Sequence, residues 1–340
     1  MADSFNGKKP GLIVTRTPLR ISFAGGGTDL AVFYEREGGA VLSTTINKFV
    51  YVTVRCHSEL FNEAYRVNYS ETEHADRLDD IRNDIARECL RLLEVHPPIY
   101  ISTVADLPAF SGLGSSSSFA VGLLNALHAY RGERVTAGQL AQEACQIEID
   151  VLKRPIGKQD QYAAAFGGLN LFTFCPDGSV TLEPQRRHQN GTIEDLFRHL
   201  MMFWTGIQRS AGSILTEQRE NVASRLPALR SLRDHAHRLR GILHDRVDPI
   251  EIGRTLDETW RVKRVLASGI SSDRIDVWYE RAIDAGAAGG KLCGAGGGGF
   301  LMLIVDPDRQ AAVRQTLHDM TEVEVGYETH GSRLLLPAPE

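Results

Sequence analysis

The sequence contains no long hydrophobic run. Its longest uninterrupted apolar stretch, residues 300–305, is far too short to cross a bilayer. The first ten residues, M-A-D-S-F-N-G-K-K-P, also lack the apolar core of a secretory signal. These two absences predict a protein that is neither inserted into a membrane nor exported, and we expect it in the cytoplasm.

Cysteine is scarce, and positive charge is not in excess. The cysteines are odd in number, widely spaced and free of any C-x-x-C pair: Cys56, Cys89, Cys145, Cys175 and Cys293. Reduced thiols in a cytoplasmic protein are the simplest account of this pattern. The formal net charge of −5 disfavours a dedicated nucleic-acid binder, which usually carries a basic excess or stripe.

Several well-known phosphate-binding and catalytic motifs are missing. The sequence has no Walker A loop, no H-R-D or D-F-G signature of protein kinases, and no H-E-x-x-H or other metal-binding spacing among its 11 histidines. Gly294, Gly296 and Gly299 do satisfy G-x-G-x-x-G. We expect a helix before these glycines and a strand after them, which is the reverse of the order in a dinucleotide-binding unit. Any phosphate chemistry must therefore use another design.

The composition that remains is that of a globular protein large enough for two domains. The 340 residues are 42% hydrophobic and 24% charged, which suits a large buried core. The polar segment 183–192, which includes R-R-H-Q-N-G, is the best candidate boundary. We therefore predict an N-terminal domain over residues 1–190 and a C-terminal domain over residues 191–340.

Hydrophobic periodicity predicts a mixture of strands and helices. The alternation of Val50, Val52 and Val54 with other residues indicates a strand within 41–55. Apolar residues at helical spacing indicate a helix over 79–95, and Ser272 is placed to cap a helix that runs to 284. Further strands are expected at 12–14, 99–104, 169–174, 199–204, 300–305 and 323–327, and further helices at 119–130, 136–150, 210–245, 249–267 and 308–320.

A glycine- and serine-rich stretch lies between a predicted strand and a predicted helix. It reads P-A-F-S-G-L-G-S-S-S-S-F-A-V-G over residues 108–122. A loop that opens a helix leaves backbone N–H groups unpaired at the positive end of the helix dipole, where they suit a nucleotide's phosphates. Gly112 and Gly114 permit close backbone approach, and the serines add hydroxyl donors and metal ligands. The alternative is a flexible, solvated turn.

A second glycine cluster occurs early in the chain, in R-T-P-L-R-I-S-F-A-G-G-G-T-D-L over residues 16–30. Three consecutive glycines, at 25–27, are costly within a helix or strand, so they predict a turn or a close approach of a ligand to the backbone. Thr28 and Asp29 follow at the rim of that turn. They either bind a ligand or cap a helix over 30–35.

The three glycine clusters together resemble, in order and spacing, the three motifs of the GHMP small-molecule kinases. The matching stretches are R-x-P-L-R-I-S-F-A-G-G-G-T-D at 16–29, P-x-x-x-G-L-G-S-S-S-S at 108–118 and G-A-G-G-G-G-F at 294–300. The resemblance implies an α+β, two-domain GHMP kinase fold, with a ribosomal protein S5 domain 2-like N-terminal domain and a ferredoxin-like C-terminal domain. ATP and its acceptor would occupy the cleft between the domains. The second motif would hold the phosphates through Pro108, Gly112, Leu113, Gly114, Ser115, Ser116, Ser117 and Ser118.

The same resemblance assigns roles to charged residues outside the glycine clusters. Phosphoryl transfer needs in-line positioning, charge neutralisation by Mg²⁺ and a group that orients or deprotonates the attacking hydroxyl. Asp160, in G-K-Q-D-Q, matches the family's aspartate beside the acceptor hydroxyl, and Lys158 either assists it or forms a salt bridge. Glu148 matches the glutamate that binds Mg²⁺ with a serine hydroxyl, which by alignment is Ser116 rather than either neighbouring serine. Arg20 matches an arginine that stabilises transferred charge or lowers the pKa of the acceptor hydroxyl.

Three stretches narrow the choice of acceptor. F-A-G-G-G-T-D-L, G-K-Q-D-Q-Y-A-A-A-F-G-G-L-N and K-L-C-G-A-G-G-G-G-F resemble the bacterial D-glycero-D-manno-heptose 7-phosphate kinases more than the galactokinases, whose first motif continues G-E-H-T-D-Y. The resemblance implies ATP-dependent phosphorylation of the anomeric C1 hydroxyl, giving heptose 1,7-bisphosphate for GDP-heptose and capsule or lipopolysaccharide synthesis. The residues expected to bind the sugar phosphate are Gly26, Gly27, Thr28, Asp29, Asp160, Gly296, Gly297 and, at the distal phosphate, Arg209.

Two other functions fit the same residues. One is a GHMP kinase for a free sugar such as fucose or another hexose, which a panel of acceptors would separate from the first. The other is a non-catalytic sugar sensor, which the retention of Asp160, Glu148 and Ser116 disfavours. The sequence leaves open the choice between ATP and GTP, the anomer and whether the protein is a homodimer.

Overall fold

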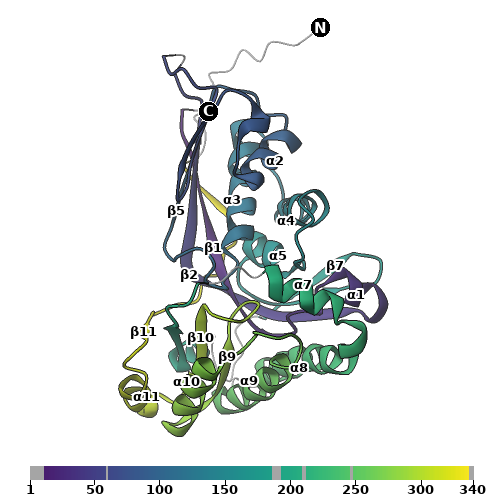
Figure 1. The fold of residues 1–340 in the computed structure, drawn as a ribbon, viewed down its shortest axis with the longest axis vertical. Coiled ribbons are helices and arrows are strands. Elements are labelled where there is room, and N and C mark those ends of the chain that lie inside the picture. The colour runs from purple at the N-terminus through teal and green to yellow at the C-terminus, as the bar shows by residue number, and fades with distance from the viewer. Residues whose placement is uncertain (1–10, 59, 186–192, 209–211, 246–247, 337–340) are drawn as a thin grey trace.

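The computed structural model describes residues 11–58, 60–185, 193–208, 212–245 and 248–336. The chain forms two sheets, each with helices packed on it, in an elongated molecule (Figure 1). The long strands of the larger sheet run through the upper part in this view, and the smaller sheet lies in the lower part with α9, α10 and α11. The buried hydrophobic residues form two cores, one that fills the upper part and extends into the lower part, and one that lies almost wholly in the lower part.

The first sheet has eight strands, with the main order β12-β1-β2-β5-β3-β4 and with β6 and β7 joined to it through β2. The strands are β1 (Ile13–Ala24), β2 (Gly39–Arg55), β3 (Tyr65–Asn68), β4 (Thr72–Ala75), β5 (Ile99–Ala105), β6 (Leu169–Phe174), β7 (Val180–Pro184) and β12 (Arg333–Leu336). The pairing is antiparallel except between β3 and β5. Because β2 is long, its first half pairs with β6 and its second half with β5.

The helices of the first half pack mainly on one another, from α2 to α5, and through α3 and α5 on β1 and β2. They are α1 (Ala31–Glu37), α2 (Asp84–Leu92), α3 (Ser115–Tyr130), α4 (Ala137–Cys145), a π-helical turn (Gln146–Val151) and α5 (Gln159–Phe166), with a 3₁₀ turn at Leu78–Asp80. Helix α3 is buried over most of its surface, which explains its almost continuous apolar sequence. A Cβ atom at Gly122 of α3 would lie 2.6 Å from the Thr17 hydroxyl of β1, so the glycine lets helix and sheet approach closely.

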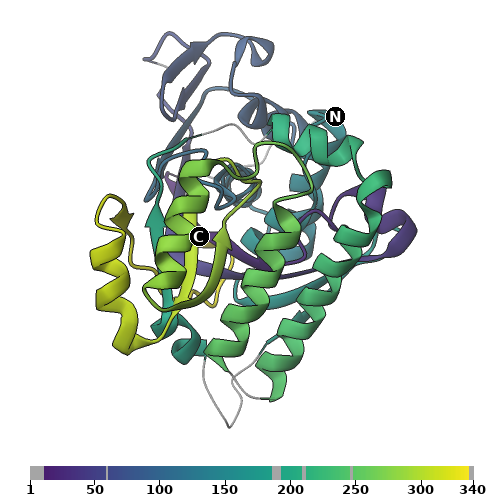
Figure 2. The same ribbon diagram turned by 60° about the horizontal axis from the view of Figure 1, so that its bottom comes forward.

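The second sheet is fully antiparallel, in the order β11-β8-β10-β9. Its strands are β8 (Leu200–Trp204), β9 (Ala287–Leu292), β10 (Phe300–Val305) and β11 (Thr321–Glu322). The helices are α6 (Ile193–His199), α7 (Gly212–Glu220), α8 (Leu226–Asp245), α9 (Pro249–Lys263), α10 (Asp273–Asp284) and α11 (Gln310–Thr316), with 3₁₀ turns at Ala223–Arg225 and Pro307–Arg309. Figure 2 shows α8 and α9 side by side, and α8 also packs on β1 and β2 of the first sheet.

Strand β10 contributes side chains to both hydrophobic cores. Met302 and Ile304 point into the core of the first part, whereas Leu301, Leu303 and Val305 point into the second core. Successive side chains of a strand face opposite sides of a sheet, so a strand buried on both faces reads as an unbroken apolar run. The sheet therefore lies between the two cores.

Most predicted elements are confirmed, and several of them begin or end at other residues than predicted. The predicted strand at 12–14 is the start of β1, which continues to Ala24 with two register shifts against β2. Ser272 caps α10 by accepting a hydrogen bond from the Ile275 N–H. The helix predicted over 308–320 is only Gln310–Thr316 after a 3₁₀ turn, and the strand predicted at 323–327 is β11 at Thr321–Glu322 plus a single bridge from Tyr327 to Ile46.

Strand β9 was not predicted, so the expectation that a helix directly precedes the third glycine cluster is wrong. Its sequence A-A-G-G-K-L contains alanine and glycine, which are depleted in strands. The glycines are required by close packing instead. A Cβ atom at Gly289 would collide with the Gly253 carbonyl of α9, and one at Gly290 with the Met302 carbonyl of β10. The glycine cluster thus joins two antiparallel strands, and the strand-glycine-helix order of a dinucleotide site is still not present.

The carboxyl-terminal strand returns to the first part of the molecule. β12 pairs antiparallel with β1 in the first sheet. The predicted C-terminal domain, residues 191–340, includes β12, although this strand belongs to the first sheet. The predicted boundary 183–192 itself falls mainly on residues 186–192, which lie outside the described residues.

Candidate active site

The glycine-serine loop opens helix α3. The helix begins at Ser115, four residues before the predicted start, and its N-cap Gly114 has the left-handed conformation, with φ of 77°, that glycine adopts without strain. The Ser118 N–H donates to the Gly114 carbonyl at 2.9 Å. The amide groups of the first turn therefore lie at the loop, where the helix dipole favours an anion. Pro108 and Ser116 are exposed, and Gly112, Gly114 and Ser115 are partly exposed, whereas Leu113, Ser117 and Ser118 are buried.

The second and third glycine clusters touch each other. A Cβ atom at Gly112 would lie 2.8 Å from the Cys293 carbonyl oxygen, and one at Gly294 would lie 2.5 Å from the Gly112 Cα. Gly299 makes a similar close approach to the Ser111 backbone. These glycines therefore permit the C-terminal loop to pack directly on the predicted phosphate loop.

Gly296 and Gly297 pack against Ile270, which lies between α9 and α10. A Cβ atom at Gly296 would lie 2.7 Å from the Ile270 carbonyl oxygen, and the Gly297 N–H donates to that oxygen at 2.9 Å. The Gly297 amide is thus already paired within the fold. Their assignment to the acceptor stays a prediction.

Arg20 and Asp160 form a bidentate ion pair, although 140 residues separate them in the chain. Arg20 Nε donates to Asp160 Oδ1 and Nη2 to Oδ2, each at 2.7 Å. Arg20 Nη1 also donates to the Gly112 carbonyl at 2.7 Å, and the Arg20 N–H donates to the Leu113 carbonyl at 3.0 Å. Arg20 is 5% exposed and the Asp160 side chain 23%. The pair therefore joins β1, α5 and the phosphate loop and leaves the carboxylate accessible.

Glu148 lies on the π-helical turn and is completely buried. Its Oε1 accepts from the Ser116 hydroxyl at 2.7 Å, and its Oε2 accepts from the Ser117 hydroxyl at 2.6 Å and from Gln161 Nε2 at 2.7 Å. The Arg154 guanidinium donates to both Glu148 Oε1, at 3.0 Å, and the Ser116 hydroxyl, at 2.7 Å. The predicted pair of metal ligands thus lies together and already binds a cationic group.

This donor set suits Mg²⁺. The ion typically uses one or two carboxylates and takes its other ligands from water and substrate phosphates, and Glu148 with Ser116 supplies such a set beside the start of α3. Within the described part of the chain, no cluster of three or more His, Cys, Asp or Glu residues forms a metal site. A site made wholly of protein ligands is therefore not found among those residues.

The first glycine cluster forms the predicted turn, and neither polar residue after it caps the helix. Helix α1 starts at Ala31 with Leu30 as its N-cap and no side-chain bond. The Thr28 hydroxyl is buried, lies 2.8 Å from the Gly25 carbonyl and accepts from the Ala40 N–H at 3.1 Å, so it holds the turn together. Gly26 and Gly27 are partly exposed.

Asp29 links the turn to the segment that carries Asp160. Its carboxylate accepts from the N–H groups of Gly27, at 2.9 Å, and Gln159, at 3.2 Å. Burial, and then the negative charge of Asp160, raise the pKa of Asp29 above its usual range. The two carboxylates therefore belong to one electrostatic site.

Two polar residues at this turn were missed by sequence reasoning. Ser22 is 6% exposed, and neither its hydroxyl nor the side-chain oxygen of Gln159 has a hydrogen-bond partner among the described residues. A Cβ atom at Gly26 would lie 4.0 Å from the Ser22 hydroxyl and 3.7 Å from Gln159 Nε2. Buried polar atoms are rarely left unpaired, so these atoms mark a place for a polar ligand. The only sequence signal was their position beside the first cluster and beside Asp160.

Sequence reasoning also missed two buried lysines near the third glycine cluster. Lys263, at the end of α9, donates to the Gly294 carbonyl, and Lys291, on β9, donates to the Ser22 carbonyl at 2.6 Å and the Phe23 carbonyl at 3.3 Å. Burial lowers the pKa of Lys263 to about 8 and lowers that of Lys291 well below its usual range. Both lysines therefore place a basic nitrogen in the interior near Arg20, whose charge acts on each of them.

Of the two other predicted cations, Lys158 lies beside the turn between β6 and β7. The Lys158 ammonium donates to the Gly178 carbonyl at 2.8 Å and lies 4.9 Å from the centre of the Tyr34 ring, so its hydrogen bond goes to the backbone of the β6–β7 turn rather than to Asp160. Arg209 lies outside the described residues. Its predicted role at the distal phosphate stays a prediction.

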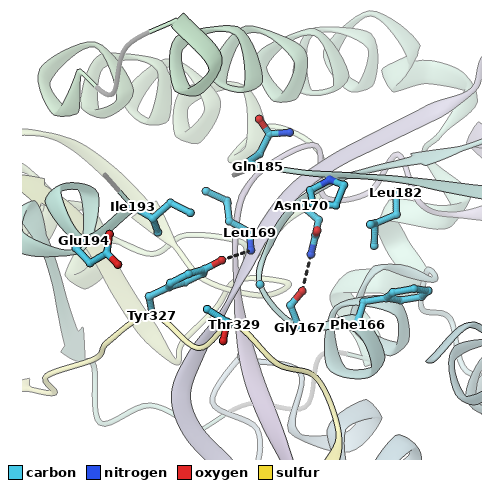
Figure 3. A pocket seen from close by; sticks show the side chains of 12 residues that line it. Phe166, Gly167, Leu169, Asn170, Leu182, Gln185, Ile193, Glu194, Tyr327 and Thr329 are labelled. Carbon is cyan, nitrogen blue, oxygen red and sulfur yellow. Dashed lines mark hydrogen bonds between the residues drawn. The ribbon is translucent and has the colours of Figure 1, made fainter. Parts of the chain in front are cut away.

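A separate cavity of about 430 Å³ lies at the other end of α5 (Figure 3). Its walls come from the end of α5, from β6 and β7, from the start of α6 and from the segment around Tyr327. Tyr327 accepts a hydrogen bond from the Leu169 N–H there at 3.3 Å. None of the predicted site residues lines this cavity.

Across the described chain, no helix combines the length and apolarity needed to cross a membrane.

The chain matches two family models, "GHMP kinases N terminal domain" over residues 81–168 and "GHMP kinases C terminal" over residues 241–321. It is 31% identical over 309 residues to the D-glycero-alpha-D-manno-heptose 7-phosphate kinase of Campylobacter jejuni, covering 88% of this chain and 91% of that protein. It is 27% identical to the L-fucokinase/L-fucose-1-P guanylyltransferase of Bacteroides fragilis, over 88% of this chain and 35% of that protein.

Solved structures agree with these matches. The crystal structure of a D-glycero-D-manno-heptose 1-phosphate kinase from Bacteriodes thetaiotaomicron superposes with a TM-score of 0.78 at 25% identity, over 96% of this chain and all of that one. The Lactococcus lactis galactokinase, at 16% identity and a TM-score of 0.73, shows the same fold over 96% of both chains. The predicted α+β GHMP kinase fold is confirmed, and the chain belongs to the GHMP kinase family as an ATP-dependent kinase.

Proposed function

We propose that the protein is a sugar kinase that transfers the γ-phosphate of ATP to the anomeric C1 hydroxyl of D-glycero-D-manno-heptose 7-phosphate. The product would be heptose 1,7-bisphosphate, made in the cytoplasm for GDP-heptose and then for capsule or lipopolysaccharide synthesis. The observation that carries the proposal is the ion pair of Arg20 and Asp160. It lies against the phosphate loop, and the charge of Asp160 acts on Asp29 of the first glycine turn, residues 25–29, which we call the acceptor turn. The 31% identity to a heptose 7-phosphate kinase supports the choice of sugar.

Asp160 is suited to receive or orient the acceptor hydroxyl. Its carboxylate is accessible and is held in one orientation by two hydrogen bonds from Arg20. The acceptor oxygen forms a bond to the γ-phosphorus, the bond from that phosphorus to the bridging oxygen breaks, and ADP leaves. The hydroxyl proton passes to Asp160. Arg20 stabilises the negative charge that moves through this site.

Glu148 and Ser116 are the residues that would hold Mg²⁺, which supplies charge neutralisation for the phosphates when bound. Their oxygens lie 2.7 Å apart, and Glu148 is kept in place by Ser117 and Gln161. Arg154 binds the same two oxygens in the present structure. We infer that Arg154 turns toward the phosphates, or toward its other partner Asp84, when these oxygens bind the metal.

The acceptor would bind between the first glycine turn and the third glycine cluster. Gly26 and Gly27 leave space at the turn, and Ser22 and Gln159 offer unpaired polar atoms to the sugar's hydroxyl groups. Asp29 is buried and would act by holding the turn against Gln159. Thr28 would act through the turn that its hydroxyl stabilises. Gly296 and Gly297 would line the opposite side, and Arg209 would bind the distal phosphate.

A kinase for a free sugar is the second candidate. The similarity to an L-fucokinase over 88% of this chain favours it, since the same turn could read hydroxyl groups without a distal phosphate.

A panel of acceptors tests the choice. ADP release should be measured with D-glycero-D-manno-heptose 7-phosphate, the unphosphorylated heptose, L-fucose and galactose, and phosphorus NMR should show a new phosphate at C1. We expect the 7-phosphate to have a kcat/KM about 10- to 100-fold above that of the free heptose, the effect of one or two charge-assisted hydrogen bonds. Equal or better turnover of a free sugar would overturn the heptose phosphate proposal and favour the second candidate.

A further inference from the structure

Lys263 is a buried ammonium whose hydrogen-bonding capacity is only partly used. It is the last residue of α9 and is 6% exposed. A lysine ammonium has three donors, and among the described residues its one hydrogen-bond acceptor is the Gly294 carbonyl. No carboxylate of the described chain lies within ion-pair distance of it. Two donors and the charge therefore remain for another partner.

The neighbouring buried lysine shows what a purely structural role looks like. Lys291 donates to two successive carbonyls of β1, those of Ser22 and Phe23, and so ties β9 to the first sheet. It is 2% exposed. Lys263, by contrast, makes a single bond, and that bond is to a loop rather than to a strand. Its position is therefore poorly explained by a role in holding the two parts together.

The position of Lys263 is where the predicted phosphate loop and acceptor turn come together. Its acceptor Gly294 packs on Gly112, and the Gly112 carbonyl accepts from Arg20. The charges of Asp29 and Arg20 both act on the Lys263 ammonium. Lys263 is thus a contribution of the C-terminal part to a site whose other residues come from β1, α3 and α5.

The charge balance at this place calls for an anion. Arg20, Lys263 and Lys291 are near enough for their charges to repel one another, and each is almost fully buried. Burying a cation without a paired anion is costly. Asp160 is already engaged by Arg20 through both oxygens. Asp29, whose charge also acts on Lys263, accepts hydrogen bonds from the Gly27 and Gln159 N–H groups and forms no ion pair with the lysine. A ligand with negative oxygens would relieve the repulsion.

We propose that Lys263 is a further catalytic residue, which donates hydrogen bonds to the non-bridging oxygens of the γ-phosphoryl group during its transfer. The proposal rests on the kinase reaction and not on which sugar accepts the phosphate. The step is the one given above, in which the acceptor oxygen bonds to phosphorus, the bond to the bridging oxygen breaks and the proton goes to Asp160. Lys263 keeps its protons throughout and acts with Arg20 from the opposite side.

The first test replaces Lys263 by Met, which keeps the length of the side chain and removes the charge. We expect kcat to fall about 100-fold, as for other single donors to developing charge, while KM for ATP and for the acceptor changes less than about threefold. Arg254→Met is the matched control, because Arg254 is an exposed cation on the same helix, and it should keep wild-type kcat. The melting temperature and calorimetric ATP binding of both variants show whether the fold and the nucleotide site are intact.

The second test is the pH profile, which a purely structural lysine would not alter. The groups that act on Lys263 are Cys293 and Lys291 from the β9 side, Arg20 from β1 and Asp29 from the acceptor turn. Because Lys263 must be charged to donate, and its pKa is about 8, kcat/KM of the wild type should decline as the pH rises through this value. In Lys263→Met this limb should be absent.

Turnover of Lys263→Met within about twofold of wild type would overturn the proposal. So would a lower kcat with the wild-type pH limb retained, since the loss would then come from a misplaced loop. The assays use whichever sugar the wild type phosphorylates. A wild-type enzyme that rejects heptose 7-phosphate but accepts another sugar contradicts the proposed substrate, and the Lys263 comparison is still decided on that other sugar.

Discussion

Replacing Asp160 by Asn separates the catalytic from the structural contribution of the Arg20 ion pair. The substitution keeps the size of the side chain and one carbonyl-type oxygen. It puts an NH₂ group where the second oxygen now accepts from Arg20 at 2.7 Å, so one of the two bonds becomes a contact between donors. Arg20 retains its bond to the Gly112 carbonyl.

The structural cost of this change is modest. A charge-assisted hydrogen bond contributes about 1.5–3 kcal/mol when buried. Asp160 is 23% exposed, and water screens part of the interaction. The loss of its charge also relieves Asp29, whose pKa it helps to raise. We therefore expect a decrease of about 1–2 kcal/mol in the free energy of unfolding, which leaves the protein folded.

The catalytic cost is larger. Loss of a group that accepts the acceptor's proton typically slows the reaction about 10²- to 10⁴-fold, which corresponds to about 3–5 kcal/mol in the activation barrier. Mg²⁺-dependent ADP release should fall by this factor, whereas ATP binding measured by calorimetry should stay within about threefold of wild type. The two effects differ enough to be told apart.

Asp319→Asn is the control for the loss of an Asp–Arg contact. Asp319 accepts from Trp278 Nε1 at 2.8 Å and pairs with Arg281 at 3.1 Å, away from the glycine loops. It should lower the melting temperature slightly and leave kcat unchanged. If Asp160→Asn turned over at the wild-type rate with intact ATP binding, the reasoning that Asp160 handles the acceptor proton would be refuted.

Three further predictions follow from other contacts. Glu148→Gln removes the charge of a fully buried carboxylate. ATP binding should therefore weaken about 10- to 100-fold with Mg²⁺ present and stay unchanged in EDTA. Equal affinities of variant and wild type with Mg²⁺ would reject the metal role. Gly112→Ala places a Cβ atom 2.8 Å from a carbonyl oxygen at a φ of +79°, so KM for ATP should rise and the melting temperature should fall, whereas Gly132→Ala, at the same φ but in open space, should lower only the melting temperature. Burial alone lowers the pKa of His128, but hydrogen bonds to Glu143 and Glu133 outweigh it and raise the pKa above 6.5. The protonated histidine therefore stabilises the fold fully below pH 6.5, and this stabilisation is lost as the pH rises through the raised pKa. The difference in free energy of unfolding between wild type and His128→Gln, measured in urea, should shrink from pH 6 to pH 9, and a constant difference would contradict it.

The local pattern of the sequence predicted the elements that carry the site. The strand, glycine-serine loop and helix that became β5, residues 106–114 and α3 were predicted in order because their periodicity and breakers are local signals. The helix start was placed too late, since serines rarely signal a helix interior and the left-handed Gly114 is visible only in three dimensions. The roles of Asp160, Glu148 and Ser116 came from family resemblance. Without it, the two carboxylates would have been interpreted as surface charges.

Tertiary structure alone decided which of these residues meet. Arg20 and Asp160 come together because β1 and α5 pack side by side, a contact across 140 residues that no local pattern encodes. Strand β9 was hidden because its glycines satisfy close packing rather than strand propensity, and β12 because it pairs with a strand at the other end of the chain. Lys263 is the clearest case, since lysine is usually exposed and only the fold shows it buried beside Arg20. The sequence by itself determined the kind of loops and the chemistry they can perform, whereas burial and long-range contacts decided which side chains do it.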